Sequence, residues 1–234
     1  MSNEFNFEIF LLLNNEKFHI YVLNENENKT FYENEKFIEN ASHDYQIHKL
    51  KEFLNNNILK IEKKINKFIT NINIILDDKK FFPIQISIKN NNNKNILTKN
   101  SLIYPLNEAR ELCSKTIGKK RVIHMMINNY KINGNDFSSI PNNLICDFYY
   151  LDVKFLCLPD KYLSNLESIL KYHQISIDKI LNFDYVDNFF KDKNLNFFQK
   201  AKRIADGCND NEIKFIDKMR ENKGFFEKIF NFFS

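Results

Sequence analysis

The cysteines and histidines of this chain are the residues best suited to bind a metal ion. Zinc ligands usually stand in close pairs along a sequence, such as two cysteines separated by two residues. His43 and His48 are five residues apart, a poor spacing for a shared ligand face on a helix. The four cysteines are scattered and none forms a close pair: Cys113, Cys146, Cys157 and Cys208. We therefore predict no metal site.

Nucleophilic or acid–base catalysis needs a reactive side chain beside a positioned base. Cys157 and His124 can in principle form a thiol–imidazole pair, but nothing places a third group to orient the imidazole. The pair Asp77-Asp78 is typical of a charged turn, and Ser138 lacks the strand–turn–helix context of a nucleophile. We interpret His124 as a hydrogen-bonded strand residue. We predict no catalytic residue and no enzymatic activity.

Glycine is scarce, at 4 of 234 residues. A phosphate cradle is built from backbone N–H groups, which glycine allows to approach the ligand closely. Gly118 stands where a helix is predicted to end, and Gly134 follows Asn133 in a hairpin-type turn. Gly224 begins the C-terminal segment, which leaves Gly207, and one glycine does not make a cradle. We therefore predict no nucleotide cofactor.

The composition is that of a folded chain, with 43% hydrophobic and 15% aromatic residues. The formal charge is only +4, from 34 basic and 30 acidic residues. Arginine, the usual reader of phosphate and guanine, is rare, so we expect no nucleic-acid partner. Scattered cysteines indicate reduced thiols in a cytosol. No signal peptide and no apolar run of ~18 residues is found, so we expect a cytoplasmic protein whose membrane contact is peripheral.

The positions of these residues depend on the predicted elements. Residues 7–13, 17–22 and 30–32 are predicted to form a strand meander. Apolar residues then recur every three or four positions, which predicts a helix over residues 45–69. Strands at 72–76 and 83–88 follow, and the polar residues 90–95 are predicted to form a loop tip.

The second half continues with alternating helices and strands. A short helix is predicted over residues 106–117, a strand over 122–127 and a long strand region over 144–158. A helix over 162–172 and a strand near 175–181 come next. The pattern of residues 182–212 is weak and predicts a connecting segment with some helix.

The C-terminal residues carry the strongest local pattern. At ~100° per residue, their aromatic side chains cover a wide face of a helix, and basic residues stand nearby. Such a face suits insertion into an anionic lipid interface. The alternative is that this helix packs on the domain or pairs with another chain. The predicted membrane-binding residues are Phe225, Phe226, Ile229, Phe230, Phe232, Phe233, Lys218, Arg220, Lys223 and Lys228.

The middle of the chain resembles the bacterial cell-division protein FtsA, of the actin-like family. The clearest segment is residues 121–134, RVIHMMINNYKING, which is similar to part of the family's small inserted subdomain. Residues 106–110, 151–156, 162–169 and 174–180 resemble, in the same order, the helices and strands around that segment. The segment that begins at Gly224 looks like the family's membrane-targeting helix.

The chain also departs from that family. The second actin-like lobe, which carries half of the nucleotide site and the usual contact with FtsZ, has no counterpart between Leu181 and the C-terminal segment. The family's Asp and Gly in the first strand–turn–strand are replaced by LLNNE at residues 12–16. Both departures argue against ATP binding.

The resemblance implies an α+β fold class. We expect a mixed-sheet actin-like first-lobe remnant over residues 1–104 and a small strand–helix–strand–strand subdomain over 105–182. A linker over 183–217 and a C-terminal amphipathic helix over 218–234 complete the expected organisation.

The function that we expect is that of a non-catalytic, membrane-tethered adaptor of the cell-division machinery, on the cytoplasmic face of the inner membrane. Its expected partners are division proteins, among them FtsZ or late-arriving membrane proteins, and a second copy of itself. Three alternatives stay open. They are an actin-like adaptor of pilus or secretion assembly, an enzyme that binds nucleotide by pairing two chains, and a cytosolic interaction module whose tail dimerises.

Overall fold

The computed structural model describes residues 6–24, 29–38, 43–190 and 194–214, except the side chains of residues 43–46 and 78. The larger of its two sheets has the strand order β3-β2-β1-β4-β9. β1, β2 and β3 form an antiparallel meander, and β4 and β9 continue the sheet in parallel. The predicted meander and mixed sheet are confirmed. The strands are β1 (Phe7–Leu13), β2 (Lys17–Asn24), β3 (Lys29–Phe37), β4 (Asn71–Leu76) and β9 (Ser176–Asn182).

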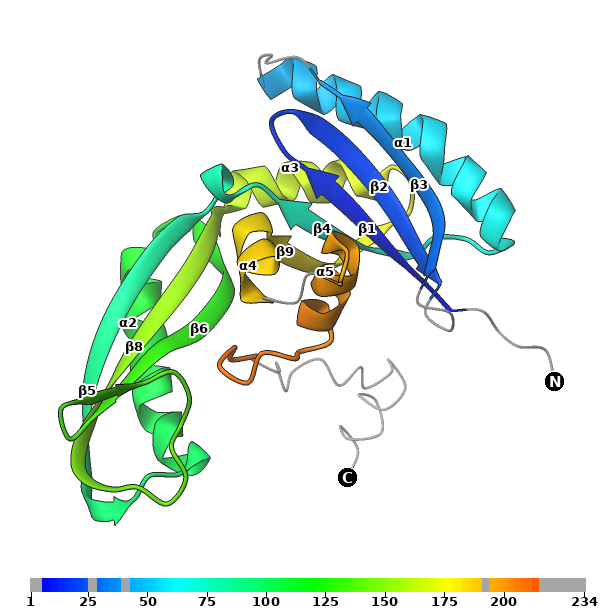
Figure 1. Ribbon diagram of the computed structural model, residues 1–234. Helices are drawn as coiled ribbons and strands as arrows, with labels where there is room; N and C mark the ends of the chain where they lie inside the picture. The colour runs from blue at the N-terminus through cyan, green and yellow to red at the C-terminus, as the bar shows by residue number, and fades with distance from the viewer. Residues whose placement is uncertain (1–5, 25–28, 39–42, 191–193, 215–234) are drawn as a thin grey trace, which may run out of the picture.

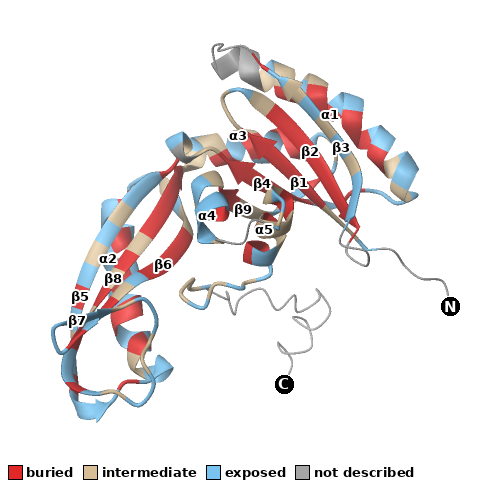
Figure 2. Ribbon diagram, viewed as in Figure 1, coloured by how far each residue is buried: buried red, intermediate tan, exposed pale blue. Residues whose placement is uncertain are grey.

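Helices cover both faces of this sheet (Figure 1). Successive residues of a strand point to opposite faces, so β1 contributes to two cores. Leu11 and Leu13 pack with α1 (His43–Ile65) and α3 (Asp160–Lys171). Phe10 and Leu12 pack with α4 (Phe183–Phe189) and α5 (Phe197–Ala205). Burial on both faces explains why β1 and β2 are nearly continuous apolar runs, and both are buried along most of their length (Figure 2).

A second, antiparallel sheet is inserted between β4 and α3 and extends from the larger sheet as an arm (Figure 1). Its strand order is β5-β8-β6-β7. α2 (Ile103–Thr116) covers one face through Ala109 and Cys113, which pack with Tyr149 and Phe155. The strands are β5 (Phe82–Ile96), β6 (Lys120–Ile132), β7 (Asn135–Phe137) and β8 (Ile145–Pro159), and two short 3₁₀ turns are η1 (Asp78–Lys80) and η2 (Lys99–Leu102).

The predicted loop tip at residues 90–95 is wrong, because β5 continues to Ile96. The strand pairs with β8 on both sides of an irregularity between Asn91 and Asn95. Asn93 and Lys94 adopt positive φ angles of 50° and 58° there. Asparagine tolerates this conformation better than most residues, so a polar run can remain part of a long strand when its partner strand is equally long.

The expected domain ranges also need correction. The second sheet begins at Phe82 and ends at Pro159, rather than spanning residues 105–182. β9 belongs to the larger sheet because it pairs with β4, and α3 packs in the core between this sheet and α1. The described part of the expected linker contains α4 and α5, and their side chains Val186, Phe198 and Ile204 are buried against the larger sheet. The weak apolar pattern of this segment concealed its packing.

Residues with a left-handed backbone conformation follow the ends of α1 and β6. α1 ends at Ile65, short of the predicted residue 69, and Asn66 follows it with φ of 52°. Asn133 and Gly134 have φ angles of 51° and 81° between β6 and β7. Two consecutive positive φ angles are what a tight hairpin turn requires, so the predicted hairpin is confirmed.

Candidate functional site

His124 joins the two sheets. Its side chain is 3% exposed, and Nδ1 lies 2.7 Å from Oε1 of Glu212. Nε2 accepts a hydrogen bond of 3.2 Å from the backbone N–H of Asn182, at the end of β9. Because Nε2 is the acceptor, the ring carries its proton on Nδ1 and donates it to Glu212. The prediction of a hydrogen-bonded strand histidine is confirmed.

Glu212 is the centre of a buried polar network. Its Oε2 accepts a hydrogen bond of 3.0 Å from the hydroxyl of Tyr185, and Nδ2 of Asn209 donates to that hydroxyl at 2.7 Å. Burial alone would raise the pKa of Glu212, but the hydrogen bonds from His124 and Tyr185 outweigh it and lower that pKa. Burial, and then the charge of Glu212, raise the pKa of Tyr185. The network holds a carboxylate beside a neutral phenol.

The same segment forms one antiparallel β-bridge with β6, between Met126 and Glu212, and we call residues 211–213 the added strand. The N–H of Ile127 donates to the carbonyl of Asn211 at 2.9 Å, and the N–H of Ile213 donates to the carbonyl of Met125 at 2.8 Å. The side chain of Asn211 also accepts a hydrogen bond of 3.1 Å from the hydroxyl of Tyr130. The edge of β6 therefore accepts an extended segment through backbone hydrogen bonds, the mode known as β-augmentation.

Beyond the added strand, a groove of about 810 Å³ lies between β6 and β9. Within the described residues, no strand pairs with residues 120–124 of β6 on the side away from β8, or with β9 on the side away from β4. Such edges present N–H and C=O groups with which a further strand can pair. Half-buried Val122 and Ile123 of β6, and Ile177 and Ile180 of β9, line the groove. It thus combines backbone edges with apolar side chains.

Charged residues surround this apolar lining. Nε of Arg121 donates to Oδ1 of Asp160 at 2.9 Å, and Nη1 donates to Oε1 of Glu167 at 3.0 Å. Lys120 and Lys179 also line the groove. A polar, charged rim around an apolar centre is the usual arrangement of a protein-binding surface.

The turn between β1 and β2, where the family resemblance would place a phosphate loop, is closed on itself. Oδ1 of Asn14 accepts hydrogen bonds from the N–H groups of Glu16 and Lys17, at 2.9 and 2.6 Å. The N–H of Asn14 donates to the carbonyl of Lys17 at 3.2 Å. An asparagine that caps its own turn in this way takes up the N–H groups that would otherwise face an anion.

The predicted membrane-binding residues lie outside the described residues, so their placement stays a prediction. None of the helices in the described ranges combines the length and the apolar character of a membrane span. The residues concerned are Phe225, Phe226, Ile229, Phe230, Phe232, Phe233, Lys218, Arg220, Lys223 and Lys228.

Among the described residues, the hydrogen bonds of the Glu212 carboxylate are made with His124 and Tyr185 and not with a cysteine. Cys157 is fully buried and interacts with Cys113, and burial raises its pKa to about 12, so the thiol–imidazole pair considered from the sequence is not formed. Cys208 is exposed. Within the described ranges, no group of three His, Cys, Asp or Glu side chains is arranged as metal ligands.

Sequence reasoning missed Glu212, Tyr185 and the added strand. Glu212 is 88 residues from His124 in the chain, and no local periodicity links two such positions. The only signal was His124 itself, because a histidine inside an apolar strand needs hydrogen-bond partners from elsewhere in the fold.

No protein-family model and no curated protein matches the sequence. The solved structures that are similar to this chain include the following three. The cytoplasmic domain of EpsL, an inner-membrane component of the type II secretion system of Vibrio cholerae, is 8% identical with a TM-score of 0.38. The PilM–PilN type IV pilus biogenesis complex is 7% identical with a TM-score of 0.49. A Bacteroides thetaiotaomicron protein with an actin-like ATPase fold is 11% identical with a TM-score of 0.38.

These matches cover 77%, 78% and 80% of this chain but only 59%, 49% and 57% of the other chains. At such identities the likeness concerns the fold alone. The larger sheet of this chain combines a three-stranded meander, two parallel strands and helices on both faces.

Proposed function

We propose that this chain is a non-catalytic adaptor that holds an extended segment of a partner protein in the groove between β6 and β9. The observation that carries the proposal is the added strand of residues 211–213. Its backbone hydrogen bonds with Ile127 and Met125 support the proposal, because they use the edge of β6 to hold an extended segment. The groove continues along the same edge and places apolar side chains beside it.

The assembly that we propose for this adaptor is of the secretion or pilus type, on the cytoplasmic face of the inner membrane. EpsL and PilM–PilN belong to machines of that kind. The C-terminal segment would serve as a peripheral membrane anchor. The second candidate is an adaptor of the division machinery, with FtsZ or a membrane division protein as partner. It is favoured by the FtsA-like residues 121–134, which supply the β6 wall of the groove and the hairpin turn.

Site-specific photo-crosslinking in cells of the source organism tests the groove. A photoreactive residue is placed at Ile123 or Ile180 in the groove, and at Phe148, which is 41% exposed on β8, as the control. We expect the same partner to crosslink from both groove positions and not from Phe148. A partner that crosslinks only from Phe148 would refute the groove. The partner's identity separates secretion or pilus assembly from division.

The non-catalytic part of the proposal is supported by the β1–β2 turn, where Asn14 takes up the N–H groups of Glu16 and Lys17. Calorimetric titration of the full chain with ATP and Mg²⁺ tests it. We expect no heat of binding. Saturable heat with one nucleotide per two chains would instead favour the enzyme that pairs two chains.

Liposome flotation tests the tail as an anchor. Removal of residues 224–234 should move the protein from the lipid fraction to the soluble fraction. Unchanged flotation would reject the tail as anchor, and a change in oligomeric state without a change in flotation would favour dimerisation through the tail.

A further inference from the structure

The outer surface of α1 and α3 exposes large apolar side chains. Phe68 is 82% exposed, Tyr172 80% and Leu59 63%. All three line one depression of about 670 Å³ above Ile58 and Ile69. Exposed apolar side chains that gather around one depression are typical of a contact surface, whereas isolated ones need no explanation. We name Leu59, Phe68 and Tyr172 the aromatic patch.

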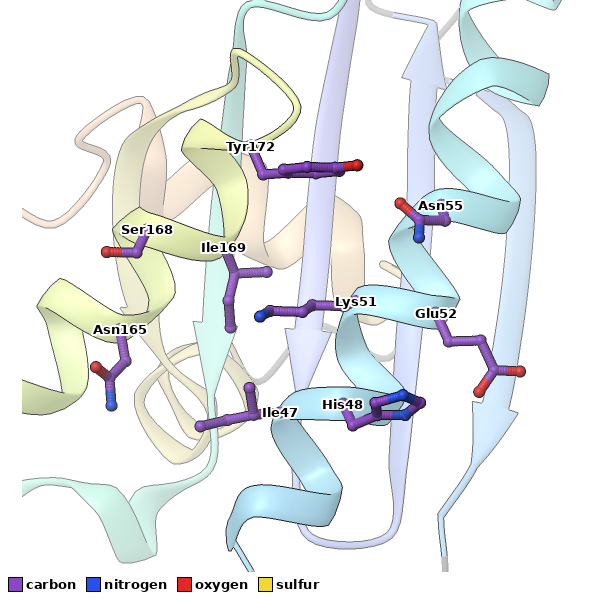
Figure 3. Close-up of a pocket in the computed structure, with 9 residues that line it drawn as sticks. All are labelled: Ile47, His48, Lys51, Glu52, Asn55, Asn165, Ser168, Ile169 and Tyr172. Atoms are coloured by element: carbon purple, nitrogen blue, oxygen red, sulfur yellow. The ribbon is translucent and has the colours of Figure 1, made fainter.

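The depression continues into the groove between the two helices. This second part has a volume of about 650 Å³ and shares Asn55 and Tyr172 with the first. Figure 3 shows Lys51 directed from α1 into the space between the helices, towards Ile169, while Glu52 points away from it. The wall of the groove therefore carries a positive charge at its centre.

Lysines surround the aromatic patch. Lys63 stands four residues after Leu59 and shares its helix face, and Lys60 and Lys67 are exposed nearby. Lys171, also exposed, precedes Tyr172. This surface therefore has an excess of positive charge.

Two acidic residues of α1 do not cancel this charge. Glu52 pairs with Lys36 at 3.3 Å and with Lys49 at 3.2 Å, on the side towards β3. Oε1 of Glu62 accepts a hydrogen bond of 3.0 Å from the N–H of Ile69. Glu52 is thus paired with two lysines, whereas Glu62 keeps its charge at the depression and is outnumbered there by the exposed Lys60, Lys63, Lys67 and Lys171.

We propose that the aromatic patch and its lysines contact the surface of an anionic lipid bilayer. Aromatic and aliphatic side chains enter the interface, and lysines reach phosphate headgroups with their flexible stems. The surrounding cations are lysines, whose point charge needs no fixed partner geometry, unlike the arginine fork. A second copy is a poor occupant, since a symmetric dimer through this surface would bring its lysines against one another.

This contact is independent of the β6–β9 groove and of the C-terminal segment. Stable peripheral binding commonly needs two weak contacts, and the patch would supply one of them from the folded domain. Leu59 lies on α1, Phe68 follows α1 and Tyr172 follows α3, whereas α4 and α5 cover the opposite face of the larger sheet.

Vesicle co-sedimentation tests the proposal with the full chain. Phe225→Ser, Phe226→Ser and Phe230→Ser are introduced first, so that the tail no longer contributes. At high lipid concentration this protein should still bind vesicles that contain phosphatidylglycerol, more weakly than the natural chain because only one contact is left, and it should not bind vesicles of phosphatidylcholine alone. Adding Phe68→Ser and Tyr172→Ser should weaken binding by roughly tenfold or more.

The matched control variants change residues of α2, the helix that covers the second sheet. Ile103→Ser and Tyr104→Ser remove side chains that are 58% and 72% exposed on α2 and should leave binding unchanged. Lys60→Glu, Lys63→Glu and Lys67→Glu should abolish binding. The same change at three exposed lysines elsewhere should reduce it much less: Lys99, Lys115 and Lys119.

Three results would overturn the proposal. They are equal binding to both vesicle types, insensitivity of binding to Phe68→Ser with Tyr172→Ser, and equal losses from the two lysine sets. A dimer in sedimentation that is lost with Phe68→Ser would assign the patch to a second copy. Circular dichroism confirms that each variant is folded.

Discussion

The β1–β2 turn and the β6–β9 groove use their backbone groups in opposite ways. In the turn, the side chain of Asn14 accepts from two N–H groups within three residues, so the turn satisfies itself. In the groove, strand edges continue past their last partner, and one of them already pairs with residues 211–213. A closed turn offers little to a phosphate, whereas an open edge offers hydrogen bonds to an extended chain.

This difference places the binding capacity of the molecule between its two sheets rather than at the turn. The end of the groove is held by His124, Glu212 and Tyr185, which join β6, β9 and α4. If that network fixes the added strand, disrupting the network should weaken the hydrogen bonds between the added strand and β6. The hydrogen bonds of the β1–β2 turn should stay intact.

The largest effect is expected for Glu212→Ala. Removal of the carboxylate leaves His124 and the hydroxyl of Tyr185 without their buried acceptor, and we expect a loss of roughly 3 kcal/mol in the free energy of unfolding for the two unsatisfied donors. Denaturant unfolding measures the loss. Hydrogen exchange should show faster exchange at Ile127 and Ile213, with no change at Lys17.

Asp210→Ala provides the matched control, because this neighbour is exposed and surface changes usually stay within about 0.5 kcal/mol. Equal losses for the two variants would mean that the network does not hold the added strand.

A smaller effect is expected from acid. Burial would raise the pKa of Glu212, but the hydrogen bonds from His124 and Tyr185 lower it below the ordinary 4.5. The stability from this group is fully present above 4.5 and is lost as the pH falls through the folded-state pKa. The free energy of unfolding is measured from pH 7 into the acid range. Below pH ~4.5 it should fall less steeply with falling pH in Glu212→Gln than in the natural chain. If the free energy of unfolding falls equally steeply with pH in both proteins, Glu212 is not the group responsible for the loss.

The elements with strong local patterns were predictable, and those formed by distant pairing were not. β1 and β2 are apolar and alternating, and the residues of α1 recur at helical spacing, so their existence followed from period alone. β5 was predicted to end before its asparagines, because its continuation depends on β8, which lies about fifty residues further along.

The candidate site was the least predictable part. His124 was interpreted correctly as a strand residue with hydrogen-bond partners, but Glu212 lay in a segment of weak pattern. α5 has its own capping box at Asn196 and Gln199, a local signal that indicates a helix start. The position of that helix against Tyr21 and Phe10 is fixed by tertiary packing of Phe198, which no local pattern encodes.

Asn14→Ala should have an intermediate effect that is confined to the turn. The N–H groups of Glu16 and Lys17 lose their acceptor, and because the turn is partly exposed, we expect a loss of about 1 kcal/mol. Denaturant unfolding gives the loss, and hydrogen exchange at Lys17 should rise while exchange at Ile213 stays unchanged. Asn15→Ala, whose side chain makes neither of these bonds, is the control. A change at Ile213 would show that the turn and the groove are coupled.

The smallest effect is expected for Arg121→Ala at the rim of the groove. Arg121 makes two ion pairs, at 2.9 Å with Asp160 and 3.0 Å with Glu167, but these side chains are nearly half exposed. Exposed pairs gain little in water and are screened by salt, so we expect a loss of roughly 0.5 kcal/mol at low salt and less at high salt. Denaturant unfolding at two salt concentrations measures it, with Lys179→Ala as a control on the opposite wall. A loss as large as that of Glu212→Ala would mean that the rim, and not the buried network, holds the two sheets together.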